Sequence, residues 1–261
     1  MVDRSGQYAA LYEKGDRSPE LIYNYIAALN QAGKPSSKIA NTYLRSQKEL
    51  NSEMNQKIIF EATTQVDSRA YTLFSKNLAG IKKLYNAEQI DAKITQAGKK
   101  TLQTAIEFGD PDLYNEAKEK VITIATAQAA EVFVLEADLI FGFASKDFKL
   151  YSKALKNYAK AFPTLDQVAQ AKKYLSQGLN VIQADKKVAD GIVAVAEAMA
   201  KSTKATYQEH ILLANVYNKV GNQKQAIAAL DQAEKMAANQ KRVQQQIQRL
   251  KEKMIQEGAK P

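Results

Sequence analysis

The sequence predicts an all-α protein, and three observations lead to that prediction. No segment alternates apolar and polar residues for long enough to form a sheet. Apolar residues recur at helical spacing instead, as in the stripe of Val243, Ile247, Leu250 and Met254. The four internal prolines all fall at positions where a helix can begin.

Start and stop signals then place the elements along the chain. The segments Ser18–Glu20 and Asp110–Asp112 each put a capping side chain before a proline at the first helical position, where its missing N–H costs nothing. Pro163 marks a further break between helices. Gly33 and Gly109 lie just before helix starts and are suited to end the preceding helix.

These signals predict fourteen helices joined by turns of a few residues. The expected ranges are 6–14, 19–32, 36–49, 52–65, 68–84, 87–108, 111–127, 130–145, 148–162, 165–183, 186–201, 204–220, 223–238 and 240–257. Such short connections favour antiparallel helical hairpins over a bundle with long crossovers.

The C-terminal half contains a repeated pattern. Similar small-first triplets begin at four alanines that are 37, 35 and 37 residues apart, namely Ala117, Ala154, Ala189 and Ala226. Residues 207–238 carry the fullest version, with a bulky, a leucine, a small and a tyrosine position, a turn glycine, and a small–large–small face: His210, Leu213, Ala214, Tyr217, Gly221, Ala226, Leu230 and Ala233. We therefore expect Tyr217 and Leu230 in the core and Gly221 in the turn between their helices.

Residues 87–238 resemble tetratricopeptide repeats, most closely within 207–238. His210 stands where that family often has tryptophan, and the closing proline of the family is absent. The resemblance implies antiparallel hairpins stacked as a right-handed solenoid, with residues 239–261 forming a capping helix and tail. Residues 1–86 are expected to form irregular hairpins that continue the same solenoid.

A second resemblance concerns the N-terminal third. The runs Tyr12–Leu21 and Gly33–Leu44 resemble the helical region that follows a thioredoxin-like domain in some exported bacterial proteins. The resemblance implies that the chain is a C-terminal module of such a redox protein, acting as a structural or dimerising accessory. The location is then periplasmic or exported, and otherwise cytoplasmic.

Composition excludes several classes of chemistry. The 261 residues include no cysteine, which rules out disulfides, thiolate metal sites and cysteine nucleophiles. His210 is the single histidine, and its place in the repeat favours packing over catalysis. The longest uncharged stretch, residues 21–33, is too short to span a membrane. We therefore expect no enzyme activity, catalytic residue, metal or cofactor.

The net charge of +9 is unevenly distributed along the chain. Residues 1–100 carry +5, residues 101–150 carry −5 and residues 151–261 carry +9. Only six of the 37 basic residues are arginine, and phosphate and base recognition rely on the forked guanidinium. The charge thus favours a solvated lysine surface over a nucleic-acid groove, although a lysine-driven binder of acidic polymers stays open.

The expected function is non-enzymatic binding of a protein or peptide, or of a second copy of the chain. A helical-hairpin solenoid presents the first helix of each repeat to a groove. In the family, certain positions of this first helix face the groove. In residues 207–238 these positions are occupied by Gln208, Ile211, Asn215, Asn218 and Lys219. Tyr174 from the preceding repeat is expected to add a flat contact surface.

The ligand preference of this face follows from one substitution. Asn215 matches one part of the carboxylate clamp in chaperone-binding members of the family, whereas the clamp lysine one turn earlier is Ile211 here. A ligand carboxylate buried beside Ile211 would lack its charge partner. We therefore expect partly apolar internal segments to bind this face better than acidic C-termini.

Overall fold

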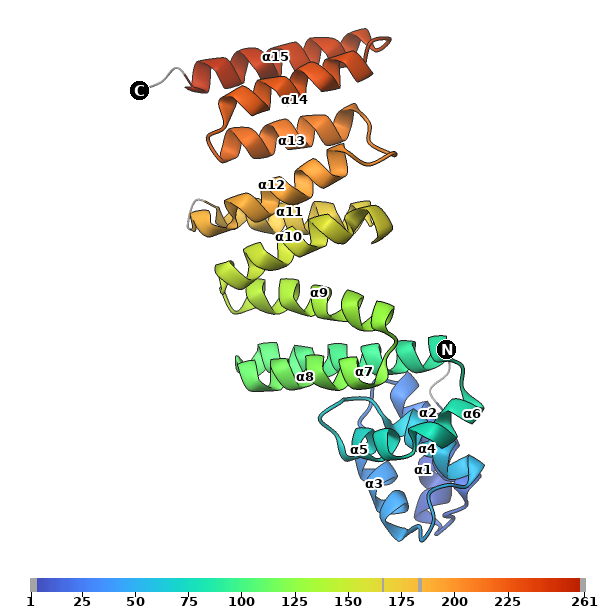
Figure 1. Cartoon of the computed structure of the whole chain (residues 1–261). Coiled ribbons are helices and arrows are strands. Elements are labelled where there is room, and N and C mark those ends of the chain that lie inside the picture. Colours follow the sequence, from blue (N-terminus) through green and yellow to red (C-terminus); the bar gives the residue numbers. More distant parts are fainter. Residues whose placement is uncertain (1–3, 166, 183–184, 259–261) are drawn as a thin grey trace. The chain divides into compact units, whose positions relative to one another are not determined.

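The computed structural model describes residues 4–165, 167–182 and 185–258. These residues form fifteen α-helices and one short 3₁₀-helix and include no strand, which confirms the all-α prediction (Figure 1). The first nine helices are α1 (Ser5–Glu13), α2 (Pro19–Gln31), α3 (Ser37–Ser46), α4 (Glu53–Ala62), α5 (Arg69–Lys76), α6 (Leu78–Leu84), α7 (Ala87–Phe108), α8 (Pro111–Ile124) and α9 (Ala127–Ala144). They are followed by α10 (Phe148–Leu165), α11 (Val168–Val181), the 3₁₀-helix (Lys186–Val188), α12 (Ala189–Ala200), α13 (Tyr207–Lys219), α14 (Gln223–Met236) and α15 (Lys241–Gly258).

Local capping chemistry sets several helix boundaries, although Ser18, the predicted cap of α2, forms no side-chain capping bond there. Asn86 and Gln89 form a reciprocal capping box at the start of α7, and Gly109 ends that helix in the left-handed conformation with φ of 63°. The side chain of Asp110 accepts hydrogen bonds from two backbone N–H groups in the first turn of α8. The predicted range 87–108 is therefore the observed one.

Two predicted divisions between helices are wrong, and several other predicted ends differ by up to three residues, as for 52–65 against Glu53–Ala62. The expected helix 68–84 is two helices, because Asn77 lies between α5 and α6 and its side-chain amide donates 2.8 Å to the carbonyl of Leu73. Pro163 does not end its helix, since α10 continues through it to Leu165. Three predicted features lie outside the described residues. They are residue 166 and the end at 183, both of the predicted helix 165–183, and the tail from residue 259.

The chain divides into two compact units, residues 1–137 and 138–261. The division falls inside α9, whereas the predicted limit at residue 86 falls inside the first unit. In the first unit α2 packs on α4, and α7 pairs with α8 as a helical hairpin. Fully buried side chains fill its core, among them Ile22, Ile26, Ile58, Phe74 and Ile94.

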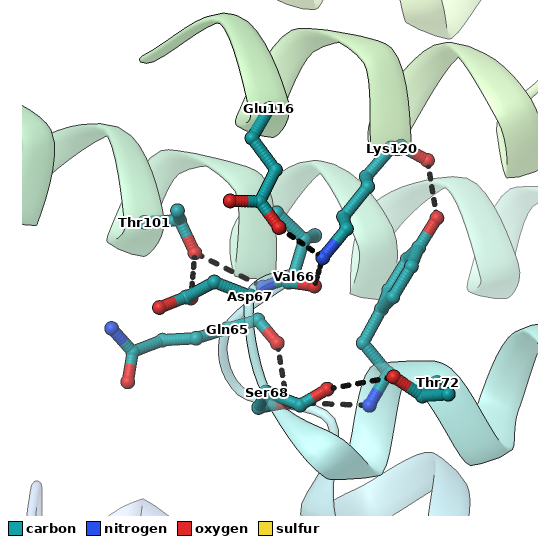
Figure 2. Close-up of polar contacts among 9 residues, drawn as sticks. Gln65, Val66, Asp67, Ser68, Thr72, Thr101, Glu116 and Lys120 are labelled. Atoms are coloured by element: carbon teal, nitrogen blue, oxygen red, sulfur yellow. Dashed lines mark hydrogen bonds and ion pairs between the residues drawn. The ribbon is translucent and has the colours of Figure 1, made fainter. Parts of the chain in front are cut away.

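A polar clamp fastens the connection between α4 and α5 to the α7–α8 hairpin (Figure 2). The hydroxyl of Thr101, on α7, accepts a hydrogen bond of 3.0 Å from the backbone N–H of Val66 and donates one of 2.7 Å to Asp67. The side chain of Lys120, on α8, donates a hydrogen bond of 3.1 Å to the carbonyl of Val66. The backbone carbonyl of Lys120 accepts a hydrogen bond of 2.7 Å from the hydroxyl of Tyr71. The buried backbone of this connection is thus satisfied by side chains of distant helices.

The second unit is built by successive helix contacts. α10 packs on α12, α12 packs on α11 and α13, α13 packs on α14, and α14 packs on α15. Three buried tyrosines connect α10 to α11, because the hydroxyl of Tyr151 donates 2.8 Å to the carbonyl of Tyr174 and the rings of Tyr158 and Tyr174 meet edge to face at 5.2 Å. α10 and α12 approach closely at Gly191, where a Cβ would lie 2.8 Å from the carbonyl oxygen of Ser152.

The α13–α14 hairpin follows the repeat pattern with one difference. Leu230 is fully buried, and Gly221 lies in the turn with φ of 83°. Tyr217 is half-buried rather than part of the core, because its hydroxyl extends to Glu197 on α12 and donates a hydrogen bond of 2.5 Å. Beyond the hairpin, α15 packs on α14 and buries Ile247 and Met254.

The equal spacing of the leading alanines does not mark equal positions in their helices. Ala154 is the seventh residue of α10, Ala189 the first of α12 and Ala226 the fourth of α14. Ala154 and Ala226 are buried, but Ala189 is only half-buried, since the core face of α12 runs through Ile192 and Val195. The repeat register inferred from the alanines is therefore wrong at α12.

Candidate functional site

The first unit contains a groove of about 790 Å³ between α7 and the C-terminal ends of α2 and α4. Its lining is dominated by amide and lysine side chains, and we call it the glutamine–lysine groove. Its lining includes Asn30, Lys34, Phe60, Glu61, Tyr85, Gln89, Lys93, Gln96, Lys99, Lys100 and Gln103.

One face of α7 forms the longest wall of this groove. Glutamine and lysine alternate along it at steps of four and three residues, and we call this set the glutamine–lysine stripe: Gln89, Lys93, Gln96, Lys100 and Gln103. The opposite face of α7 is apolar and buried, as at Ile90 and Ile94. Because 3.6 residues make one turn, the stripe places one polar side chain on each turn of the helix.

Two aromatic rings form the wall near the N-terminal end of α7. The rings of Phe60 and Tyr85 are stacked, with centroids 3.7 Å apart and planes inclined by 8°. Burial raises the pKa of Tyr85 to about 12, with smaller contributions from the neighbouring Tyr23 and Glu61. The phenol therefore stays neutral at physiological pH, and this wall is an apolar surface with a hydroxyl.

Glu61 is the one carboxylate among the lining residues of the groove, and it is well satisfied. The side-chain amide of Asn30 donates hydrogen bonds of 2.9 Å to Oε1 of Glu61 and of 2.9 Å to the backbone carbonyl of Glu61. Lys93 lies on the other side, with Nζ 3.0 Å from that carbonyl and 3.8 Å from Oε2. Burial lowers the pKa of Lys93, and the charge of Glu61 opposes that shift.

The remaining lysines give the groove its net positive charge. Lys34 and Lys100 are exposed. Lys99, which lies at the edge, pairs with Glu136 at 2.7 Å. Lys34 donates a hydrogen bond of 3.1 Å to the hydroxyl of Ser5, and Lys93 is balanced by Glu61, so the cation that faces a ligand is chiefly that of Lys100.

This groove is not among the sites predicted from the sequence, although the sequence contains one signal for it. The alternating spacing of glutamine and lysine from residue 89 to residue 103 marks a polar stripe on a helix that is otherwise apolar on its other face. A polar stripe alone is typical of any solvated helix. Only the packing of α2 and α4 beside α7 turns it into the wall of a groove.

The residues predicted on α13 are placed in different environments. Gln208, Asn215 and Lys219 are exposed, and Ile211 is half-buried. Asn218 is also half-buried, and its side-chain amide donates 3.1 Å to Glu257 of α15. Ligand binding by this surface of α13 stays a prediction.

Tyr174 cannot be the contact surface that the sequence predicted. Its side chain is 1% exposed, it lies against Tyr158, and its hydroxyl accepts 2.8 Å from Gln170. The stripe of α11 that contains Tyr174 packs into the core of the second unit, because the small residues Ala171 and Gly178 on the same face allow close approach.

A further groove of about 750 Å³ lies in the second unit between α10 and α12. Alanines and lysines line most of it, including Ala159, Ala194, Ala198 and Lys160. Its other two lysines are paired, Lys156 with Asp190 at 2.9 Å and Lys201 with Glu197 at 3.2 Å. This groove is accordingly less charged toward a ligand than the glutamine–lysine groove.

The contact between Tyr217 and Glu197 makes the stability of the second unit depend on pH. The hydrogen bond from Tyr217 holds the pKa of Glu197 below its ordinary value of 4.5, and Lys201 adds to that effect. A carboxyl whose pKa is lowered by folding stabilises the native state at pH values above its ordinary pKa. This contribution is lost as the pH falls through the lowered pKa.

We expect Tyr217→Phe to lower the free energy of unfolding at neutral pH. The decrease should be smaller in acid, where Glu197 is protonated in both the native and the unfolded state. The ring and its packing are kept, so the difference reports the hydrogen bond. Denaturation of both proteins across the acid range measures it, with NMR titration of Glu197 as a direct control. An equal loss at every pH would contradict this assignment.

Comparison with known proteins gives no further assignment. Within the described residues, no cluster of three or more His, Cys, Asp or Glu side chains could hold a metal ion, and no helix is long and apolar enough to cross a membrane. No protein-family model, curated protein or solved structure matches this chain.

Proposed function

We propose that this chain is a non-catalytic scaffold that binds an acidic segment of a partner protein in the glutamine–lysine groove. The observation that carries the proposal is the convergence of amides and lysines from α2, the turn that follows it and α7 on one hollow of about 790 Å³. Binding grooves commonly combine an apolar wall with a few polar groups that fix orientation, and here the Phe60–Tyr85 pair supplies that wall.

Charge complementarity selects the partner. The lining contains four lysines and one glutamate, and the glutamate is already balanced by Lys93. An acidic segment entering the groove meets the exposed amine of Lys100 and no unpaired carboxylate of the lining. An exposed ion pair contributes about 0.2–1 kcal/mol, so Lys100 gives preference more than affinity.

The amides contribute contacts that do not depend on the sequence of the partner. A glutamine amide offers two donors and one acceptor. Gln96 is exposed on the wall of the groove, and Gln103 is also exposed but donates a hydrogen bond of 3.1 Å to Glu107. The resemblance of the α13–α14 hairpin to a tetratricopeptide repeat also supports a binding role, since solenoids of that class bind protein segments. The absence of cysteine and the single histidine favour a scaffold over an enzyme.

A charge-reversal experiment tests the proposal. The full chain and its Lys100→Glu variant are titrated with a panel of fluorescent synthetic peptides of equal length, acidic, neutral or basic. We expect the chain to prefer acidic peptides and the variant to bind them about fivefold more weakly, because one attraction becomes a repulsion. The matched control is Lys82→Glu, which changes the net charge equally at an exposed lysine of α6.

Circular dichroism of both variants shows that they remain folded. If acidic peptides bind the groove variant and the control variant equally well, the glutamine–lysine groove is not the binding site. If the chain prefers neutral or basic peptides, charge does not select the partner and the proposal fails.

A further inference from the structure

We propose that the segment bound in the glutamine–lysine groove is an α-helix, with an apolar or aromatic residue toward one end and acidic residues about three turns away. This inference rests on the proposed function and adds the conformation and the side-chain pattern of the partner. It is carried by the period of the glutamine–lysine stripe and by the different chemistry at its two ends.

The period of the stripe fits a helix laid alongside α7. Its steps of four and three residues average 3.5 residues, which at 1.5 Å per residue is about 5.3 Å. A partner helix presents one side chain per turn of about 5.4 Å, so contacts stay in step along the whole stripe. Helices that pack side by side generally do so through rows of this period.

An extended segment does not match the same wall. Same-face side chains of a strand are about 6.8 Å apart, since each residue advances about 3.4 Å. Over the four intervals from Gln89 to Gln103 a strand covers about 27 Å, whereas the stripe covers about 21 Å. The mismatch of about 6 Å exceeds one full step of the stripe, so most side chains of a strand would fall between the polar groups.

The two ends of the stripe differ in chemistry and set the pattern on the partner. Tyr85 lies two residues before the start of α7 and stacks on Phe60, so the apolar wall lies at the Gln89 end. Lys100 follows Gln89 by eleven residues, or about three helical turns. A complementary helix carries an apolar or aromatic residue opposite the rings and a carboxylate opposite Lys100.

The middle of the stripe is suited to polar side chains of the partner. Lys93 is 13% exposed and is engaged with Glu61, so it offers little charge to a ligand. Gln96 is exposed and can donate to and accept from a neighbouring amide or carboxylate. Glutamine, asparagine or acidic residues at one per turn therefore fit the central part of the partner helix.

Three synthetic peptides separate conformation from charge. The first is a hydrocarbon-stapled helix with a tryptophan near one end, glutamates three turns away and glutamine between them on the same face. The second is the unstapled sequence with two central prolines, which hold it extended. The third is a stapled helix of the first composition, with the glutamates moved to the face opposite the tryptophan. Each is titrated by calorimetry into the full chain, into Lys100→Glu and into the control Lys82→Glu.

We expect the first peptide to bind at least about fivefold more tightly than the other two, and Lys100→Glu to remove that advantage while Lys82→Glu keeps it. If the proline-containing peptide binds as tightly as the stapled helix and is still weakened by Lys100→Glu, the groove binds an extended segment. The helical inference is then overturned and the proposed function stands. If Lys100→Glu weakens none of the peptides, the proposed function is overturned together with this inference.

Discussion

Leu230→Ala should destabilise the protein by about 2–5 kcal/mol, the range for truncating a fully buried leucine. Leu230 is 0% exposed, and it lies on the face of α14 that also buries Ala226 and Ala233. Alanine at this position leaves a cavity that small neighbours cannot fill, so both the lost burial and the void contribute. Chemical denaturation of the full chain measures the change in the free energy of unfolding.

Gln232→Ala is the matched control for this substitution, because Gln232 is exposed on the same helix. Its effect should stay within about 0.5 kcal/mol. A loss below about 0.5 kcal/mol for Leu230→Ala would show that α14 does not bury Leu230 in the core.

Thr101→Val should destabilise the first unit by about 1–3 kcal/mol, the cost of leaving a buried donor unsatisfied. Valine keeps the shape of threonine but removes the hydroxyl that accepts from the backbone N–H of Val66 and donates to Asp67 (Figure 2). Both Thr101 and Val66 are 0% exposed, so water does not replace the lost partner in the native state. Denaturation of the full chain, followed by probes in each unit, measures the effect.

Thr123→Val separates the hydroxyl contact of Thr101 from the general effect of valine in a helix. Thr123 is exposed on α8, and its hydroxyl donates to the carbonyl of Glu119 in its own helix. We expect a change within about 0.5 kcal/mol for this control. Equal effects of the two substitutions would mean that the clamp contributes nothing measurable.

The helices were largely predictable because their ends are encoded locally. Asn86 and Gly109 flank α7, and each acts on backbone groups within one turn of itself. The wrong predictions arise where the end of a helix depends on a contact with a distant residue or on a less common local contact. Asn77 divides one expected helix through a side-chain bond to Leu73, and α10 continues past Pro163 although proline usually ends a helix.

The repeat register and the candidate site were less predictable, because both depend on which face of a helix meets another helix. The small residue that matters for the packing of α12 is Gly191, which meets Ser152 of α10, and not Ala189 of the expected triplet. Tyr174 belongs to a helical stripe whose sequence does not say whether a neighbour covers it. The glutamine–lysine groove likewise exists only because residues far apart in sequence pack beside α7.

The clamp at Val66 also constrains the order in which the first unit can fold during synthesis. Its hydrogen bonds join Val66 to residues 35 and 54 positions later in the chain. While the ribosome still covers α7 and α8, the connection after α4 has no protein partner for its backbone and stays hydrated. Closing contacts over such separations is entropically costly, so this connection gains its final hydrogen bonds only when the α7–α8 hairpin arrives. A nascent chain that stops before residue 101 lacks both of these side-chain partners of Val66, and one that stops before residue 120 still lacks the partner of the Val66 carbonyl.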